Sequence, residues 1–209
     1  MVLIPKSIDV NISTGSKLLG HKIMKILHLL VVLIFVSGLL TAQENGDVFD
    51  SRDIFGGPAI KYSYSDYIGA YSGGNIGWLV NDTYSVGFSG YGLISGITLR
   101  DDDKYLNFDY GGLELGWLIA SDMTIHFYFN GLIGFGSASL HKKYRRDCYR
   151  SNLLYVLEPS ANLILNVTEY FRVGLGTSYR YVSGLDLDGI GDDYFNNVST
   201  ILSFQFGRL

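Results

Sequence analysis

Apolar and polar residues alternate with a period of two along most of the chain from residue 56 onward, the pattern of half-buried β-strands. No window there has a sustained helical stripe. Eight strands are predicted, over residues 56–64, 71–80, 83–95, 108–119, 123–138, 153–166, 170–183 and 195–207. Short turns at Asn81-Asp82, Ser121-Asp122 and Thr168-Glu169 alternate with longer loops near 65–70, 96–107, 139–152 and 184–194. This alternation predicts a series of antiparallel hairpins.

The two faces of the predicted strands differ in side-chain size. One face is bulky and apolar, as in Ile76 and Trp78 or Phe127 and Phe129, whereas the opposite face is mostly Gly, Ser, Asn and a few charged residues. An eight-stranded barrel has an interior only just wide enough for side chains to fill. The bulky face would overfill that interior, so we expect it to point outward. Lipid suits such an exterior, because a closed barrel satisfies its backbone hydrogen bonds within hydrocarbon.

Aromatic residues lie near both ends of the predicted strands, as in the two aromatic girdles of membrane barrels. The residues expected beside the short turns are Trp78, Tyr84, Trp117, Phe171 and Phe206, and those expected beside the long loops are Tyr62, Tyr64, Tyr155, Tyr179 and Tyr181. The strand lengths also agree with the roughly 9 to 11 tilted residues that cross a bilayer.

Composition narrows the functional classes. Only 17% of the 209 residues are charged, against about 25% in an ordinary soluble domain. The net charge of −4 argues against a nucleic-acid partner, which favours basic proteins. The single cysteine, Cys148, excludes an internal disulfide and a cysteine-based zinc site. We expect no metal and no cofactor, and Cys148 either stays unused or pairs between molecules.

The N-terminal part has the plan of a signal peptide. The uncharged run Ile26–Leu40 follows Lys22 and Lys25 and precedes Thr41-Ala42, and it is shorter than the roughly 20 residues of a membrane-spanning helix. We expect residues 1–42 to be an extension plus signal peptide with its true start at Met24. Residues 43–55 would then be a short periplasmic leader and 56–209 the transmembrane barrel.

In strand number, turn alternation and the closing strand VSTILSFQF (198–206), the chain resembles the small eight-stranded outer-membrane proteins of Gram-negative bacteria, the OmpA/OmpX type and its generic β-barrel relatives. The resemblance implies an all-β, antiparallel, up-and-down transmembrane barrel in the cell outer membrane. It also implies contact with outer-membrane lipids and lipopolysaccharide, insertion by the barrel-assembly machinery, and a monomeric state. Phe206 is followed by Gly207-Arg208-Leu209, whereas the closing strand of the family usually ends in an aromatic residue.

Several ionisable residues have inward parity. Buried charges persist when they are paired, so we expect a hydrogen-bonded charge network that fills the lumen, and the resemblance implies the same. Its members are Lys61, Glu114, His126, Glu158, Arg172 and Arg180. The alternative is a gated ion path, because ionisable residues within a membrane often mark pathways.

The predicted loop 139–152 is strongly basic and contains one acid, Asp147. Its cations are Lys142, Lys143, Arg145, Arg146 and Arg150. The loop is either a solvated segment near the headgroups or a contact site for an anionic partner such as lipopolysaccharide phosphates or a host polyanion. The acidic loop 184–194 lacks the spacing of a calcium-binding loop and is expected to be polar and glycine-rich.

The function expected from these patterns is that of a non-enzymatic outer-membrane barrel with a filled lumen and with loops for adhesion, envelope integrity or lipid contact. The alternatives are a narrow channel for small solutes, a lipid-modifying enzyme and a soluble ligand-binding barrel. Catalysis is disfavoured because no outward Ser has an outward His on its own strand, and His126 has inward parity.

Overall fold

The computed structural model describes residues 54–64, 69–94, 97–99, 104–120, 123–142, 148–150, 153–184 and 192–207. All of them belong to the compact unit Asn45–Leu209. The predicted signal peptide, the leader up to residue 53 and the Ser121-Asp122 turn lie outside the described residues. Among the described residues, no helix has the length and apolar character needed to cross a membrane.

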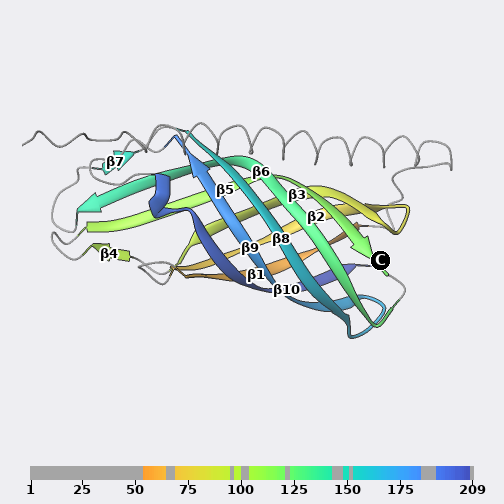
Figure 1. Cartoon of the computed structure of the whole chain (residues 1–209). Helices are drawn as coiled ribbons and strands as arrows, with labels where there is room; N and C mark the ends of the chain where they lie inside the picture. Colours follow the sequence, from red (N-terminus) through yellow and green to blue (C-terminus); the bar gives the residue numbers. More distant parts are fainter. Residues whose placement is uncertain are drawn as a thin grey trace, which may run out of the picture. The chain divides into compact units, whose positions relative to one another are not determined.

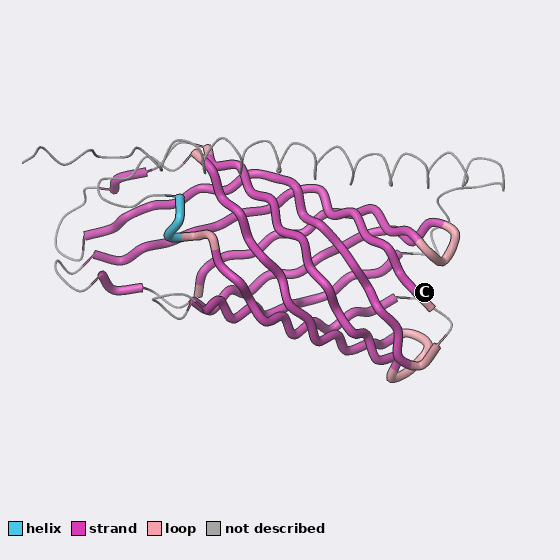
Figure 2. The backbone as a smooth tube through the Cα atoms, viewed as in Figure 1, coloured by secondary structure: helices cyan, strands magenta, loops and turns pink. Residues whose placement is uncertain are grey.

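Eight long strands form the barrel in the described part of the chain (Figures 1 and 2). They are β1 (Ile54–Tyr64), β2 (Gly69–Val80), β3 (Tyr84–Leu93), β5 (Lys104–Ile119), β6 (Ile125–Lys142), β8 (Leu154–Asn166), β9 (Phe171–Ser183) and β10 (Asn197–Gly207). Each long strand pairs antiparallel with the next, and β1 pairs with β10. The predicted closed, antiparallel, eight-stranded barrel is therefore confirmed.

The turn between β2 and β3 illustrates how local sequence sets the hairpins. Asn81 and Asp82 both have positive φ, 53° and 52°, and the amide of Thr83 donates to the carbonyl of Val80 at 3.3 Å. A tight turn with two left-handed residues matches the twist of the strands that it joins, and Asn and Asp tolerate that conformation. The predicted turn thus fixes the register of β2 against β3.

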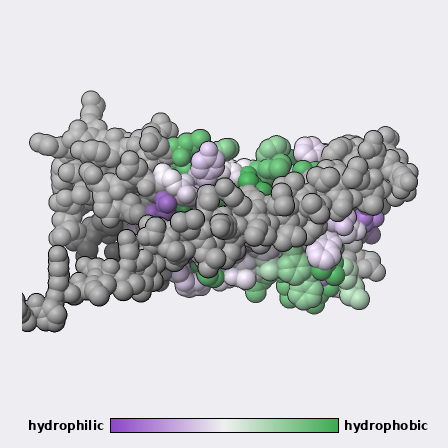
Figure 3. Space-filling model, turned by 45° about the horizontal axis from the view of Figure 1, so that its top comes forward, coloured by the Kyte–Doolittle hydropathy of each residue, from purple (hydrophilic) through white to green (hydrophobic). Residues whose placement is uncertain are grey.

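The outer wall of the barrel is apolar, as the alternation predicts. Phe88, Phe127 and Leu175 are each more than half exposed, and apolar residues gather on the described part of the wall in Figure 3. Three residues with outward parity are buried instead, namely Val80, Leu115 and Leu157. Each lies in register with a bulky residue of a neighbouring strand, respectively Tyr84, Val86 and Tyr181.

The expectation of an inner face made mostly of small and polar residues is wrong for the half of the lumen near the long loops. A buried apolar cluster fills that half and includes Tyr71, Tyr91, Phe108, Tyr110 and Phe195. The polar expectation holds better midway along the barrel, where Lys61, Glu114 and Glu158 are buried. A smaller apolar cluster of Leu79, Leu118, Tyr128 and Ile164 lies toward the short turns. The lumen is therefore layered, with a polar middle between two apolar clusters.

The predicted loops 96–107 and 139–152 are partly wrong, because strand pairing continues into both. β5 and β6 stay in register as far as Lys104 and Lys142. The short strands β4 (Ile97–Leu99) and β7 (Cys148–Arg150) pair with their outer edges. Figure 1 shows β4 and β7 at the end of the barrel to which β5 and β6 extend. We call β4, β7 and the parts of β5 and β6 at 104–107 and 139–142 the sheet extension. Strand β1 also begins at Ile54, within the predicted leader, and a 3-10 helix (Asp192–Tyr194) precedes β10.

Candidate functional site

The central feature of the lumen is an ion pair between β1 and β8. The Lys61 Nζ lies 2.9 Å from Glu158 Oε2, and both side chains are almost completely buried. The hydroxyls of Tyr110 and Ser178 each donate to the Glu158 carboxylate at 2.7 Å. Lys61 Nζ also lies 3.4 Å from the centre of the Tyr91 ring. Both charges are therefore paired as a buried ion pair requires.

Arg180 of β9 is the main polar group in the apolar half of the lumen near the long loops, and its side chain has no solvent exposure. Its guanidinium donates to Tyr71 Oη at 2.9 Å, to Ser63 Oγ at 3.3 Å and to Tyr110 Oη at 3.3 Å. Its Nε donates to the carbonyl of Phe195 at 3.2 Å. Arg180 thus links strands β1, β2, β5 and β9 to the segment that precedes β10.

Phe195 closes the lumen at the end near the long loops. Its ring stacks on Phe108 with centroids 4.4 Å apart, and Tyr194 packs edge-on against it. The side chain of Asn196 accepts a 2.7 Å hydrogen bond from the amide of Val182. The described segment 194–196 is therefore folded into the mouth of the barrel rather than extended as a loop.

Glu114 of β5 lies apart from the Lys61–Glu158 pair and has neutral partners. Its Oε1 accepts hydrogen bonds from Asn75 Nδ2 at 3.1 Å and from Tyr128 Oη at 3.3 Å. No described cation forms an ion pair with it. The structure therefore brings Lys61, Glu158 and Arg180 into one hydrogen-bonded group through Tyr110, and Glu114 forms a second group.

His126 and Arg172 lie nearer the short turns, and both are buried. Arg172 Nε donates to Asn166 Oδ1 at 2.8 Å. Neither ring nitrogen of His126 has a hydrogen-bond partner among the described residues, and the inward side chain two positions later is Tyr128. A catalytic nucleophile needs a base within hydrogen-bond reach. Among the described residues, no hydroxyl lies within hydrogen-bond reach of His126, so His126 does not serve as such a base for any of them.

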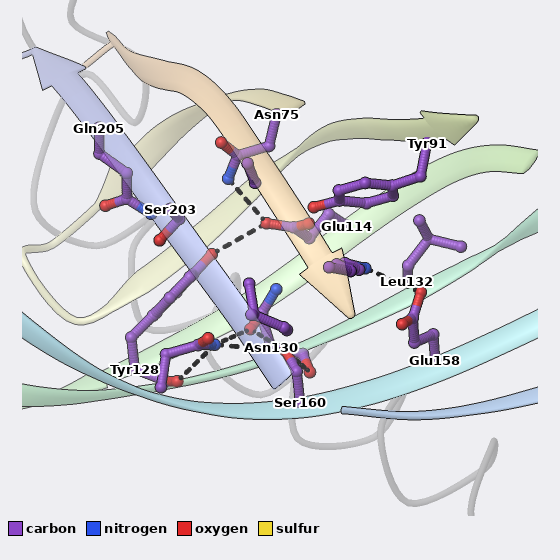
Figure 4. Close-up of a pocket in the computed structure, with 14 residues that line it drawn as sticks. Asn75, Tyr91, Glu114, Tyr128, Asn130, Leu132, Glu158, Ser160, Ser203 and Gln205 are labelled. Atoms are coloured by element: carbon purple, nitrogen blue, oxygen red, sulfur yellow. Dashed lines mark hydrogen bonds and ion pairs between the residues drawn. The ribbon is translucent and has the colours of Figure 1, made fainter. Parts of the chain in front are cut away.

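A small cavity remains between the Lys61–Glu158 pair and Glu114 (Figure 4). Its volume is about 20 Å³, enough for roughly one water molecule. Its lining comes from seven of the eight long strands, and Lys61, Glu114 and Glu158 are the charged residues of that lining. On one wall, Asn130 Oδ1 accepts hydrogen bonds from Ser160 and Asn162. At this level the described lumen therefore holds a small chamber and not a wide pore.

The ten residues predicted for the aromatic girdles all lie at outward positions, and none is buried. Among those near the short turns, Phe171 and Phe206 pack with ring centroids 5.1 Å apart, and Trp117 packs on Phe129 at 6.3 Å. Near the long loops, Tyr155 packs on Phe135 at 5.3 Å. Adjacent strands thus present neighbouring aromatic rings at both ends.

The basic residues are only partly placed. Lys142 ends β6 and Arg150 ends β7, where Arg150 lies in register with Ser139. Lys143, Arg145 and Arg146 lie outside the described residues. Lys142 lies seven residues beyond Phe135 on β6 (142 minus 135). Seven residues extend about 24 Å along a strand. The backbone therefore carries Lys142 well beyond the last aromatic residue of the outer wall on β6.

Sequence reasoning missed the aromatic residues that hold the lumen charges. Tyr110 bonds to Lys61, Glu158 and Arg180, and Tyr71 lies against Arg180, whose guanidinium carbon is 4.2 Å from the ring centre. Both have the parity of the charged residues, so the signal was present. An apolar or aromatic inward residue simply interrupts the alternation on which the strands were assigned.

The comparisons with known proteins agree with this geometry. No protein-family model matches the chain, and no curated protein matches it in sequence. Among solved structures, the crystal structure of neisserial surface protein A (NspA) is similar, with a TM-score of 0.55 and 12% identity, over 75% of this chain and 96% of that one. The chain has the fold of the small outer-membrane β-barrels.

Two further outer-membrane barrels are similar to the chain. The N-terminal barrel domain of OprF from Pseudomonas aeruginosa has 12% identity and a TM-score of 0.47, over 74% of this chain and 97% of that one. Ail, the attachment invasion locus protein of Yersinia pestis, has 17% identity and a TM-score of 0.48, over 75% and 96% respectively.

Proposed function

We propose that the protein is an integral outer-membrane barrel without catalytic activity that is closed to solutes and holds the sheet extension at the cell surface for contact with the anionic phosphates of lipopolysaccharide. The filled lumen carries this proposal. The chamber lined by Lys61, Glu114 and Glu158 has a volume of about 20 Å³, and the described interior also holds one apolar cluster with Phe108 and Phe195 and another with Leu118 and Ile164.

The described residues form no catalytic arrangement around His126, which supports a binding or structural role. The buried His126 has no hydroxyl or carboxylate partner among the described residues, and no described group of three His, Cys, Asp or Glu residues could hold a metal ion. Fold by itself does not determine function, so the argument rests on these side chains.

The surface role rests on charge and reach. Residues 142–150 contain five cations and one acid, and β6 and β7 carry the two ends of this segment beyond the barrel wall. A basic cluster attracts phosphate groups. Lipopolysaccharide is the anion that surrounds a protein in the outer leaflet, so an envelope-stabilising contact with its phosphates fits this position.

Two measurements test the proposal. Reconstitution in planar bilayers should give no conductance, whereas reproducible single-channel steps would favour a narrow channel. Retention on immobilised lipopolysaccharide should be lost when Lys142, Lys143, Arg145, Arg146 and Arg150 are all changed to Gln. Changing the three acids Asp101–Asp103 to Asn serves as the control and should leave retention intact. Equal retention by the five-cation variant would contradict the surface role.

A further inference from the structure

His126 is a buried ionisable side chain that belongs to neither charged group of the lumen. It lies near the start of β6 and is 3% exposed. Neither ring nitrogen has a hydrogen-bond partner among the described residues. The backbone of Met123 is near enough to interact with the ring, without meeting the geometry of a hydrogen bond. Since buried polar groups are normally hydrogen-bonded, the imidazole is held in place by packing.

The surroundings of His126 toward the short turns are apolar. In register it lies opposite Ile164 of β8, which belongs to the buried apolar cluster with Leu79, Leu118 and Tyr128. Tyr128 is also the next inward residue along β6, and its hydroxyl is neutral near pH 7. A charge on the imidazole would therefore lie beside the side chains that fill this end of the lumen.

The charge that acts on His126 is positive. Arg172 of β9 interacts electrostatically with the ring, and no described acid does so. Arg172 donates to Asn166 Oδ1 at 2.8 Å, and Asn166 is neutral. The described acids in the short turns, Asp82 and Glu169, are exposed. A buried charge is costly unless an opposite charge accompanies it, so a proton on His126 would add a positive charge that no described acid offsets.

We propose that His126 is an acid-sensitive lock on the short-turn end of the lumen: the neutral imidazole packs with the apolar cluster and holds this end closed, and protonation in a mildly acidic medium opens it. The proton is bound as the cluster opens, because water can then solvate the imidazolium and screen it from Arg172. This regulation goes beyond the closed barrel proposed above, which is then the state at neutral pH.

The test compares unfolding at two pH values. The full chain is folded into phosphatidylcholine vesicles and unfolded in urea at about pH 7.5 and at about pH 5.5, one unit to either side of the pKa of about 6.5 that a histidine has in an unfolded chain. At the lower pH the unfolded chain binds a proton on this residue that the closed barrel does not bind. Stability is then lost as the pH falls, and the folded-to-unfolded ratio should decrease about tenfold between the two pH values.

Hydrogen exchange shows where the barrel opens. After correction for the intrinsic effect of pH, exchange of the Leu79 and Leu118 amides should be about tenfold faster at the lower pH. Exchange of the Phe108 amide, in the apolar cluster near the long loops, should change less than about twofold. Equal acceleration of all three amides would contradict a lock at the short-turn end.

Variants assign the pH effect to one residue. His126→Leu places an apolar side chain beside the cluster, and the ratio should then change less than about threefold between the two pH values. If this variant does not insert, His126→Gln serves in its place with the same expected result. His141→Gln removes the other histidine of residues 43–209 and should keep the tenfold effect. A wild-type change below about threefold would overturn the proposal, as would a tenfold effect that persists without His126 or that disappears without His141.

Discussion

Removal of the Glu158 side chain should destabilise the barrel strongly. In Glu158→Ala, the buried ammonium of Lys61 loses its partner at 2.9 Å, and the hydroxyls of Tyr110 and Ser178 lose their acceptor. Breaking a buried ion pair by removing one partner typically costs 3–5 kcal/mol. We therefore expect the free energy of unfolding to fall by about 3–5 kcal/mol. Glu169→Ala, in an exposed turn, should cost less than about 0.5 kcal/mol.

A double-mutant cycle separates the ion pair from the packing. Replacing both charges, in Lys61→Met with Glu158→Leu, leaves no unpaired charge, so most of the lost stability should return, to within about 2 kcal/mol of the wild type. Urea unfolding in lipid vesicles, followed by the fluorescence of Trp78 and Trp117, measures each variant. A loss below about 1 kcal/mol in Glu158→Ala, or simple additivity of the two single changes, would refute the role given to this pair.

Three further predictions test other parts of the barrel by the same unfolding assay. Gly116→Ala should lower the free energy of unfolding by about 1–3 kcal/mol, since the new methyl group would collide with Ser85 and Tyr128. Gly131→Ala should be nearly neutral because nothing lies within 4 Å of the added Cβ. Equal effects of the two changes would contradict the packing of the lumen. Phe195→Ala should cost about 3–5 kcal/mol through loss of its stacking inside the mouth, and a neutral result would mean that the segment does not close the lumen. Leu175→Arg, which places a charge midway along the outer wall of β9, should cost about 2–4 kcal/mol, and tolerance of this charge would argue against lipid contact there.

The eight long strands could be predicted because their two faces meet different surroundings. In β6, outward Phe127, Phe129 and Phe135 alternate with inward His126, Tyr128 and Gly134, and a one-residue slip would reverse every face. The pattern fails where both faces are apolar or both are polar. Residues 104–107 at the start of β5 were assigned to the loop 96–107, whereas Phe108 and Tyr110 fall within the predicted strand 108–119, although both point into an apolar layer.

The pairing of the lumen charges could not be predicted from parity. Parity states that Lys61, Glu114, Glu158 and Arg180 face inward, but the stagger of the strands around the barrel decides which of them meet. Lys61 and Glu158 are 97 residues apart in the chain, and they come together from β1 and β8. Glu114 forms no ion pair with a described cation, although an acidic residue among inward cations had suggested one.

The most direct test of the barrel's orientation is spin labelling of successive residues along β6. Single cysteines from Ile125 to Phe135, introduced in a Cys148→Ser background and reconstituted in vesicles, report collision with oxygen dissolved in the lipid. We predict high oxygen accessibility at the odd positions and low accessibility at the even ones, with a period of two over the whole segment. A uniform profile, or high accessibility at His126 and Tyr128 with low accessibility at Phe127 and Phe129, would contradict an apolar wall in lipid around a closed polar lumen.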